Sequence, residues 1–342
     1  MSKKYRVGVV GATGVVGQEI IKILEARKFP VQLLRCFASE RSLGQTVEFN
    51  GQRIDVEVLS QETLTDLDFA LFSAGSSISK EYCPIAAERG IVCIDNTSHF
   101  RMEEGIPLVV PEVNKDALKN HNNIIANPNC STAQMMVVLK PILDAVGIKR
   151  VVVSTYQSVS GAGSSAIKEL EDQSRANLSG QELAPKAFSA PIAFNVIPQI
   201  DVFLDNGYTK EEIKMINETK KILGSDDIKV TATTVRVPVF VSHSEAINIE
   251  TQQYLSADDA RKLLANTPGV KVVDDPEKLK YPTPRDAAGK DDVLVGRIRQ
   301  DVSIDNGIEL WCVGDNLRKG AALNAVQIAE LIISKYSNSI NI

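Results

Sequence analysis

The fold of this chain is decided by a short stretch near its beginning, Arg6-Val-Gly-Val-Val-Gly-Ala-Thr-Gly-Val-Val-Gly17. The apolar residues up to Val10 predict a buried strand, and an amphipathic helix is expected from Gly17 onward. Glycine suits the turn between them, because the backbone must approach a pyrophosphate closely and the helix N-terminus offers free N–H groups. We therefore predict dinucleotide contacts from Gly11, Thr13, Gly14, Val15 and Val16. The alternative is a turn that serves only the packing of strand against helix.

Strand and helix patterns alternate beyond this turn, which is typical of parallel βαβ units and predicts a doubly wound sheet. The expected strands are 6–10, 32–37, 68–73 and 91–95, and the expected helices are 17–27 and 79–89. Residues 46–58 alternate in polarity around Asn50-Gly51, a dipeptide typical of two-residue hairpin turns. We expect this hairpin to be an antiparallel addition to the sheet.

Longer strand patterns after Cys130 indicate a second domain with a mixed sheet. A helix is expected from there to about Val146, with Pro141 kinking or ending it. Strand-like segments at 150–158, 228–250 and 293–299 are separated by helices near 165–178, 209–223 and 257–266. A final apolar helix, about 320–334, is expected to pack on the first domain.

The predicted fold class is α/β with two domains. The first is a Rossmann-type doubly wound parallel sheet formed by residues 1–129 and completed by residues 316–342. The second, residues 130–315, is an α+β catalytic and dimerisation domain with a mixed sheet. Its long strands offer faces for pairing two subunits, so we expect a homodimer, with a homotetramer as the alternative.

Composition and charge exclude several classes of protein. The chain carries 38 basic and 43 acidic residues, a net charge of −5, which disfavours binding to a nucleic-acid backbone. No segment approaches the roughly 20 apolar residues of a membrane span, and the N-terminus lacks the pattern of a signal peptide. The five cysteines form no CxxC pair, so neither a metal site nor a disulfide framework is predicted, and a cytoplasmic location fits best.

The end of the second strand indicates which dinucleotide is bound. NAD-binding units usually carry an acidic residue at this strand tip, where it holds the ribose hydroxyls. This chain instead has Cys36-Phe-Ala-Ser-Glu-Arg-Ser42, with no acid at the tip itself. Arg41 with Ser39 or Ser42 suits a 2′-phosphate, so the sequence favours NADP(H) over NAD. The alternative is a solvated turn in which Glu40 disfavours the extra phosphate.

Cys130 differs from the other four cysteines, which lie in apolar strands or within a helix. It follows Asn127-Pro-Asn and opens a helix, where the positive end of the helix dipole favours a nucleophilic thiolate. Spacing alone does not separate a nucleophile from a buried residue at a helix start. A thiolate catalyst usually needs an acid/base partner. The chain has three histidines: His121 in a polar loop, His99 after a strand, and His243 at a polar break in a long strand region.

Four segments resemble one enzyme family over nearly the whole chain. They are 11–17, 127–132, 154–163 and 314–322, and their order and approximate spacing resemble the bacterial aspartate-β-semialdehyde dehydrogenases. The resemblance implies that NADPH reduces L-aspartyl-4-phosphate to L-aspartate-4-semialdehyde with release of phosphate. This step leads toward lysine, diaminopimelate, methionine and threonine.

The resemblance also assigns roles to individual residues. It makes Cys130 the nucleophile that forms a thioester, His243 the acid/base, and Gln157 the residue that orients the substrate. Arg236 matches the arginine that grips the substrate α-carboxylate, and Asn129 is placed in the substrate site. The phosphate site falls on Arg101 and Lys214, and further cofactor contacts fall on Ser160, Gly161 and Asn316. For Gln157 and Arg236, the alternatives are an ordinary polar strand end and a surface arginine.

Glu211 and Lys214 are three residues apart and share one face of a predicted helix. Glu211 suits the substrate ammonium, and Lys214 suits the leaving phosphate. The alternative is a solvated ion pair of a kind common on helices. Glu212 competes for the ammonium, although its side chain would point about 100° away from that of Glu211.

Three other functions fit part of the pattern. N-acetyl-γ-glutamyl-phosphate reductases do the same chemistry on an acylated amine, but they usually have glycine where this chain has Asn129. A non-catalytic dinucleotide-binding redox sensor would use Cys130 only as a reactive thiol. A cysteine hydrolase gives no role to the glycine-rich turn.

Overall fold

The computed structural model describes residues 3–336 and consists of two compact units. The first contains the residues up to Asn129 and those from Ala321 onward, and the second runs from Cys130 to Gly320. Residues 337–342, which the sequence assigned to the first domain, lie outside the described range. Between residues 3 and 336, no helix is both long and apolar enough to cross a membrane.

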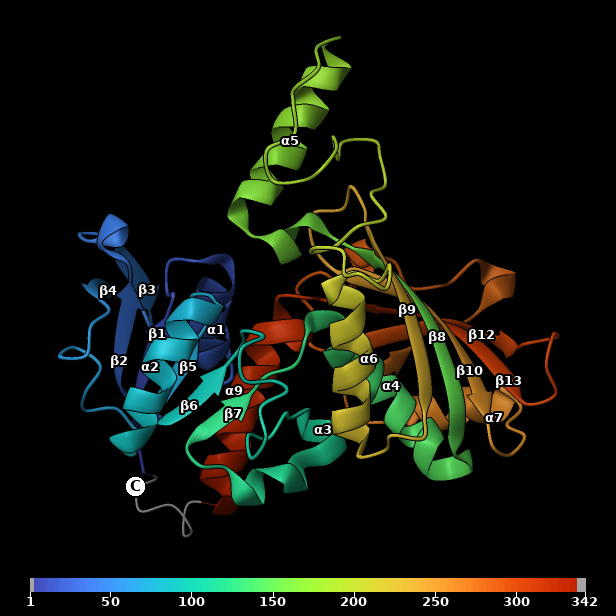
Figure 1. Cartoon of the computed structure of the whole chain (residues 1–342), viewed down its shortest axis with the longest axis horizontal. Coiled ribbons are helices and arrows are strands. Elements are labelled where there is room, and N and C mark those ends of the chain that lie inside the picture. The colour runs from blue at the N-terminus through green and yellow to red at the C-terminus, as the bar shows by residue number, and fades with distance from the viewer. Residues whose placement is uncertain (1–2, 337–342) are drawn as a thin grey trace. The chain divides into compact units, whose positions relative to one another are not determined.

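The first unit is built on a seven-stranded sheet in the order β3-β4-β2-β1-β5-β6-β7 (Figure 1). Its strands are β1 (Tyr5–Val10), β2 (Val31–Ala38), β3 (Thr46–Phe49), β4 (Gln52–Val58), β5 (Phe69–Phe72), β6 (Val92–Asp95) and β7 (Ile124–Ala126). All neighbouring strands are parallel except β3 and β4. Helices α1 (Val15–Ala26), α2 (Ser76–Glu88) and α9 (Leu323–Leu331) belong to this unit. The predicted doubly wound sheet is confirmed.

The C-terminal helix completes the core of the first unit. Side chains of α1 and α9 belong to one apolar cluster with the sheet, including Ile20, Leu24, Val326 and Ile328, all fully buried. The expected hairpin forms, but its second strand also pairs in parallel with β2, Cys36 lying opposite Val56. The hairpin therefore extends the main sheet at its edge.

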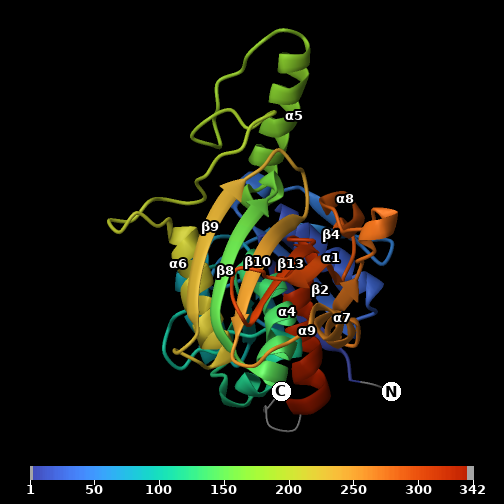
Figure 2. The same cartoon turned by 90° about the vertical axis from the view of Figure 1, so that its right-hand side faces the viewer.

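The second unit contains a mixed six-stranded sheet in the order β11-β12-β13-β10-β8-β9. The strands are β8 (Ile148–Gln157), β9 (Lys229–Arg236), β10 (His243–Thr251), β11 (Val270–Val272), β12 (Val293–Gln300) and β13 (Gly307–Gly314). Helices α4 (Cys130–Val146), α6 (Lys210–Leu223) and α7 (Ala257–Ala265) contact the sheet or one another and lie on one face of it (Figure 2). The predicted mixed sheet is confirmed.

The structure adds detail to three local expectations. Helix α4 runs to Val146, as expected, and does not end at Pro141, because its residues from Ser131 to Ile142 are largely buried and tertiary packing outweighs the lost hydrogen bond. The strand-like segment 228–250 is two strands, since the chain breaks between β9 and β10, where Ser242 has a φ of 79°. The last helical segment begins as a π-helical turn, Arg318–Ala322, before α9.

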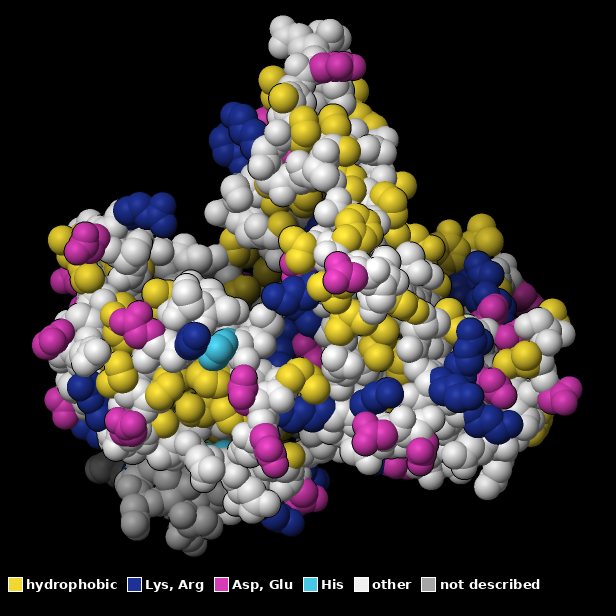
Figure 3. Space-filling view, viewed as in Figure 1, with side chains coloured by type: hydrophobic (Ala, Val, Ile, Leu, Met, Phe, Trp, Pro, Cys, Tyr) yellow, Lys and Arg dark blue, Asp and Glu magenta, His cyan; other side chains and the backbone are white. Residues whose placement is uncertain are grey.

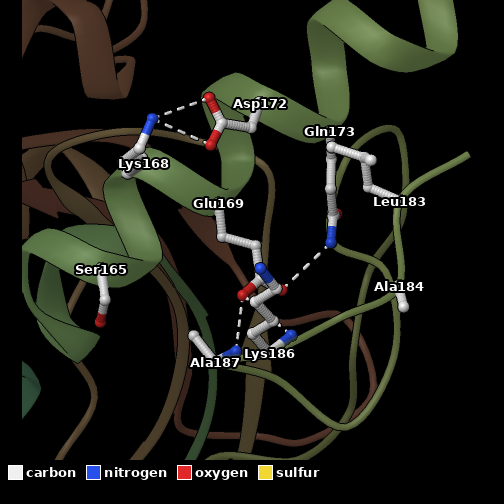
Figure 4. A pocket seen from close by; sticks show the side chains of 9 residues that line it. All are labelled: Ser165, Lys168, Glu169, Asp172, Gln173, Leu183, Ala184, Lys186 and Ala187. Carbon is white, nitrogen blue, oxygen red and sulfur yellow. Dashed lines mark hydrogen bonds and ion pairs between the residues drawn. The ribbon is translucent and has the colours of Figure 1, made fainter.

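Helix α5 (Ser164–Leu178) extends beyond the end of the second unit's sheet (Figure 2). Two buried side chains of α5 form hydrogen bonds with the backbone of the segment that follows the helix and runs back along it. Glu169 accepts hydrogen bonds from the backbone N–H groups of Lys186 and Ala187 (Figure 4). Gln173 accepts from the backbone N–H groups of Ile192 and Ala193. We call α5 and the returning residues 179–204 the arm.

Candidate active site

The glycine-rich turn has the geometry of a close backbone approach. Gly11 has a φ of 88°, and a side chain there would meet the backbone carbon of Ser73 at 2.9 Å. A Cβ on Gly17 would lie 2.1 Å from the carbonyl oxygen of Gly11, so strand and helix pack too closely for any other residue. Gly14 precedes α1 without a side-chain cap, which leaves the first N–H groups of the helix available for an anion.

A cleft of about 700 Å³ opens beside this turn and is lined by Gly11, Thr13, Gly14, Ser39, Glu40 and Arg41, among others. Ser39 and Arg41 are exposed at its rim, as expected for groups that meet a ligand. Ser42 is buried instead, with its hydroxyl 3.2 Å from that of Thr13. Val15 and Val16 are half-buried in the first turn of α1.

Cys130 is the first residue of α4, and it is the one cysteine of the five that is not buried. The π-helical turn passes close behind it, because a Cβ added to Gly320 would lie 2.8 Å from the Cβ of Cys130. A glycine at 320 is therefore needed for this approach. The other thiols sit in apolar surroundings; burial raises the pKa of Cys36 to about 12 and that of Cys312 well above its ordinary value.

His243 is the first residue of β10 and is fully buried. Its Nδ1 lies 3.0 Å from the backbone nitrogen of Ser158, which donates a hydrogen bond to it. Its Nε2 has no hydrogen-bond partner within the described part of the chain. Burial, followed by the positive charge of Arg236, lowers the pKa of His243 well below the usual range, so the imidazole is neutral at physiological pH.

Arg236, the last residue of β9, is buried beside His243 and Gly161. A Cβ on Gly161 would lie 3.1 Å from its Nη1 and 3.2 Å from Nε2 of His243, which places the three groups together. Nη1 donates to the carbonyl of Ser158 at 2.7 Å. Burial lowers the pKa of Arg236, while nearby charges on Cys130 and Glu211 raise it in part. The surface-arginine alternative is excluded by this burial.

Gln157 and Glu211 meet inside the second unit. The Gln157 amide lies 3.3 Å from Oε1 of Glu211, and Oε2 of Glu211 lies 3.2 Å from Nζ of Lys214. Lys214 also pairs with Asp201 at 2.7 Å, and both carboxylates raise its pKa although burial opposes them. The ion pair between Glu211 and Lys214 is therefore present. It differs from an ordinary solvated helix pair, because it is largely shielded from solvent and Glu211 also contacts Gln157.

Both carboxylate oxygens of Glu212 form hydrogen bonds with the backbone. One of its carboxylate oxygens accepts from the backbone N–H of Thr209 and the other from that of Thr234, which caps α6 and joins it to β9. The two glutamates, adjacent in sequence, therefore differ in what they can do. Glu211 alone of this pair contacts the side chain of Gln157.

Ser158, Ser160 and Asn316 form a polar network around the ring of His243. The Asn316 oxygen accepts from the Ser242 backbone at 2.9 Å and lies 3.1 Å from each of the two serine hydroxyls. All of these side chains are buried. From the sequence, Ser160, Gly161 and Asn316 were expected only as cofactor contacts. The hydrogen bonds that connect Ser160 and Asn316 to His243 through Ser158 were missed, because no local pattern links positions 158, 243 and 316.

Two further predicted residues lie in the first unit. Arg101 is buried and donates to the backbone carbonyls of Asn96 and Asn127, each at 2.9 Å. Asn129 is also buried; it directly precedes Cys130 and ends the first segment of this unit.

Comparison with known proteins identifies the family. Residues 6–121 match the semialdehyde dehydrogenase NAD-binding domain, and residues 139–319 match the semialdehyde dehydrogenase dimerisation domain. An aspartate-semialdehyde dehydrogenase of Aquifex aeolicus is 54% identical over 97% of this chain and 98% of its own length. The chain belongs to the aspartate-semialdehyde dehydrogenase family. A relative from Bacillus subtilis is 52% identical over 96% of this chain and 98% of its own.

Solved aspartate-semialdehyde dehydrogenases have the same fold. Enzyme II of Vibrio cholerae, solved in complex with ASA, superposes with a TM-score of 0.96 at 52% identity and covers 98% of this chain and 100% of that one. The enzyme of Candida albicans, solved with NADP, gives a TM-score of 0.75 at 25% identity over 98% of this chain and 99% of that chain. The resemblance stated from the sequence is therefore confirmed.

Proposed function

We propose that this chain catalyses the NADPH-dependent reductive dephosphorylation of L-aspartyl-4-phosphate to L-aspartate-4-semialdehyde. The observation that carries the proposal is the position of the buried Arg236, which lies beside Nε2 of His243 at Gly161 and interacts electrostatically with Cys130 and Glu211. One cation thus stands among a nucleophile, an imidazole and a carboxylate, which suits an amino acid activated as an acyl phosphate.

Cys130 forms the covalent intermediate. The helix N-terminus and Arg236 favour the thiolate, which attacks the acyl carbon; the carbon–sulfur bond forms, the carbon–oxygen bond to phosphate breaks, and phosphate leaves. A later collapse of the reduced adduct breaks the carbon–sulfur bond and restores the thiolate. The chain's own residues need only hold the acyl carbon, neutralise developing charge and exclude water.

Substrate recognition follows from charge. The planar guanidinium of Arg236 grips the α-carboxylate, and Glu211 accepts the ammonium, because Glu212 is committed to backbone N–H groups. Gln157, bound to Glu211, orients the intermediate near the thiol. We assign the phosphate to Lys214 and Arg101, and Asn129 to the substrate side of Cys130. A neutral acylated amine would leave Glu211 without its cation, which disfavours N-acetyl-γ-glutamyl phosphate.

The first unit fits a bound dinucleotide. The pyrophosphate is assigned to the uncapped start of α1 and the backbone at Gly11, Thr13, Gly14, Val15 and Val16, because no side chain fits at Gly11 or Gly17. Ser39, Arg41 and Ser42 are assigned to the 2′-phosphate of NADP(H), and Ser160, Gly161 and Asn316 to further contacts. When bound, the reduced nicotinamide supplies the hydride that brings the acyl group to the aldehyde level.

We further propose that two copies associate through the second unit. The arm exposes the apolar side chains of Leu178, Leu183, Phe194, Val196, Val202 and Phe203. Figure 3 shows hydrophobic side chains along the projecting part of the surface. Exposed apolar surface of this kind is typical of protein interfaces. A homodimer is the proposed state, with a tetramer as the alternative. None of the five cysteines, all within the described residues, forms a disulfide, and we propose a cytoplasmic location.

The direct test is the reverse reaction, followed by the appearance of NADPH. We expect L-aspartate semialdehyde to reduce NADP only when phosphate or a phosphate analogue such as arsenate is present, and the N-acetylglutamate semialdehyde to react poorly. Preference for the acylated substrate would support the rival reductase. Absence of any phosphate-dependent reduction would contradict the proposal and favour a non-catalytic sensor.

A further inference from the structure

The ammonium group of Lys214 is shared by two carboxylates. Its Nζ lies 2.7 Å from Oδ2 of Asp201 and 3.2 Å from Oε2 of Glu211. An ammonium has three N–H donors, so these two acceptors leave one donor for a further ligand. The three side chains carry one positive and two negative charges. Because Glu211 is assigned to the substrate ammonium, Asp201 is the carboxylate that remains with Lys214 when substrate binds.

Asp201 keeps its negative charge at neutral pH. Burial alone would raise its pKa, but the hydrogen bonds from Lys214 and from the backbone N–H of Val202 outweigh burial and lower the pKa of Asp201 below its usual range. The side chains of the pair are only 31% exposed for Asp201 and 20% for Lys214. Their charges are therefore screened less than those of a fully solvated ion pair.

The backbone is held in place on both sides of Asp201. Ile197 exchanges two backbone hydrogen bonds with Arg236, at 2.9 and 2.8 Å, and the carbonyl of Val202 accepts from the backbone N–H of Lys210 at 2.8 Å. Asp201 itself has a φ of 67°, a conformation that Asp and Asn tolerate better than most residues. The carboxylate therefore cannot move far from the ammonium unless these contacts change.

We propose that Asp201 competes with phosphate for Lys214 and thereby weakens the binding of phosphate at the active site. This inference rests on the proposed function, which assigns Lys214 to the phosphate, and it adds a residue that the arm supplies. A phosphate group carries more than one negative charge near neutral pH, so a carboxylate bound to the same ammonium repels it. Phosphate is the first product of the proposed reaction, and weaker binding favours its release.

Calorimetric titration of the full-length protein with inorganic phosphate tests the proposal without turnover. Asp201→Asn removes the charge, keeps an oxygen that accepts hydrogen bonds, and tolerates the positive φ. We expect this variant to bind phosphate about three- to tenfold more tightly than the wild type, because the repulsion is gone. Unchanged binding would show that Asp201 does not compete, and weaker binding would show that it only holds Lys214 in place; either result would overturn the proposal.

Two further variants control the titration. Asp205→Asn makes the same charge change four residues along the chain, where Asp205 is exposed and pairs with no described cation, so its affinity should stay within about twofold of the wild type. An equal gain in Asp205→Asn would attribute the effect to overall charge and refute the proposal. Lys214→Ala should bind phosphate about tenfold more weakly or worse. Unchanged binding in Lys214→Ala would remove Lys214 from the phosphate site and overturn the inference with it.

Kinetics of the reverse reaction distinguish phosphate from the rest of the substrate. Asp201→Asn should lower the KM for phosphate by about the factor found in the titration and leave the KM for L-aspartate semialdehyde within about twofold. A change confined to the semialdehyde would place Asp201 at the amino-acid part of the site and contradict the proposal. Because the titration requires no turnover, its outcome is independent of whether the proposed reaction is found.

Discussion

The guanidinium of Arg236 is the residue on which substrate recognition depends. It is buried, makes one hydrogen bond to the carbonyl of Ser158, and lies beside His243 and Gly161. A buried cation with spare N–H groups is costly unless an anion completes its environment. A carboxylate that hydrogen-bonds bidentately to the guanidinium supplies this anion. A lysine ammonium cannot form the same planar, bidentate pair.

Arg236→Lys should therefore raise KM and lower kcat/KM by about 100-fold, a loss of roughly 2.7 kcal/mol in transition-state binding. Steady-state kinetics with L-aspartate semialdehyde measure both constants. Arg299→Lys is a matched control, since Arg299 lies on β12 of the same sheet and pairs with Glu309 at the surface. Equal kinetics in the two variants would remove Arg236 from the carboxylate site.

Arg41 is the residue that should decide cofactor choice. It is exposed at the rim of the cleft beside the glycine-rich turn, next to Ser39 and Glu40. Arg41→Glu should weaken binding of NADPH about tenfold or more and leave NADH within a few-fold, because only NADPH carries the 2′-phosphate. Fluorescence titration of each cofactor measures this. Equal weakening of NADPH and NADH binding would show that Arg41 does not bind the 2′-phosphate.

At the scale of elements, a buried polar contact joins α4 to β10. Gln134, one turn after Cys130, donates to the backbone carbonyl of His243 at 3.3 Å, and a side chain at Gly314 would collide with it. Glu245, two residues beyond His243, is fully buried and neither carboxyl oxygen has a hydrogen-bond partner in the described chain. Burial raises its pKa well above the ordinary value.

Glu245 should make the protein less stable as pH rises. The folded state keeps the proton that the unfolded chain releases above its ordinary pKa of 4.5, so the free energy of unfolding falls between that value and the raised folded pKa. Glu245→Gln removes the titration and should be more stable than wild type at about pH 8, with the difference shrinking toward about pH 4. Urea unfolding across this range measures it.

The matched control for this prediction is Glu250→Gln. Glu250 lies on the same strand but faces Lys149 at 3.6 Å, so its substitution should not reproduce the pH dependence. Identical pH profiles for wild type and Glu245→Gln would contradict the account of the buried acid.

Sequence patterns predicted the elements well where local chemistry sets them. The glycines at 11, 14 and 17, the Asn50-Gly51 hairpin and the start of α4 at Cys130 each have a local physical reason, and each was found. Helix α4 continues past Pro141 to the expected end at Val146, because its packing outweighs the proline's local cost. The double pairing of β4, the capping role of Glu212 and the contacts of Asn316 with Ser158 depend on residues distant in the chain, and no local pattern could indicate them.

At the scale of the whole molecule, the exposed apolar surface of the arm is not accounted for by the fold of a single subunit. Its exposed apolar residues and the match of residues 139–319 to a dimerisation domain point to pairing of two chains. Phe203→Asp should weaken that pairing at least tenfold, because a carboxylate would be buried against apolar side chains. Sedimentation velocity over a range of concentrations measures this.

Val302→Asp is the control for Phe203→Asp. Val302 is 99% exposed on a loop outside the arm, so its replacement should leave the assembly unchanged. An unchanged dimer in Phe203→Asp, or a monomeric wild-type protein, would exclude the arm as the interface.

The central claim is that Cys130 carries the acyl group between the release of phosphate and reduction. Mixing the enzyme with L-aspartyl-4-phosphate in the absence of NADPH, followed by acid quench and mass spectrometry, tests it most directly. We expect one phosphate released per active site and an aspartyl adduct on the peptide that contains Cys130, with neither in Cys130→Ala. Phosphate release without an adduct on Cys130, or turnover by Cys130→Ala, would contradict the account.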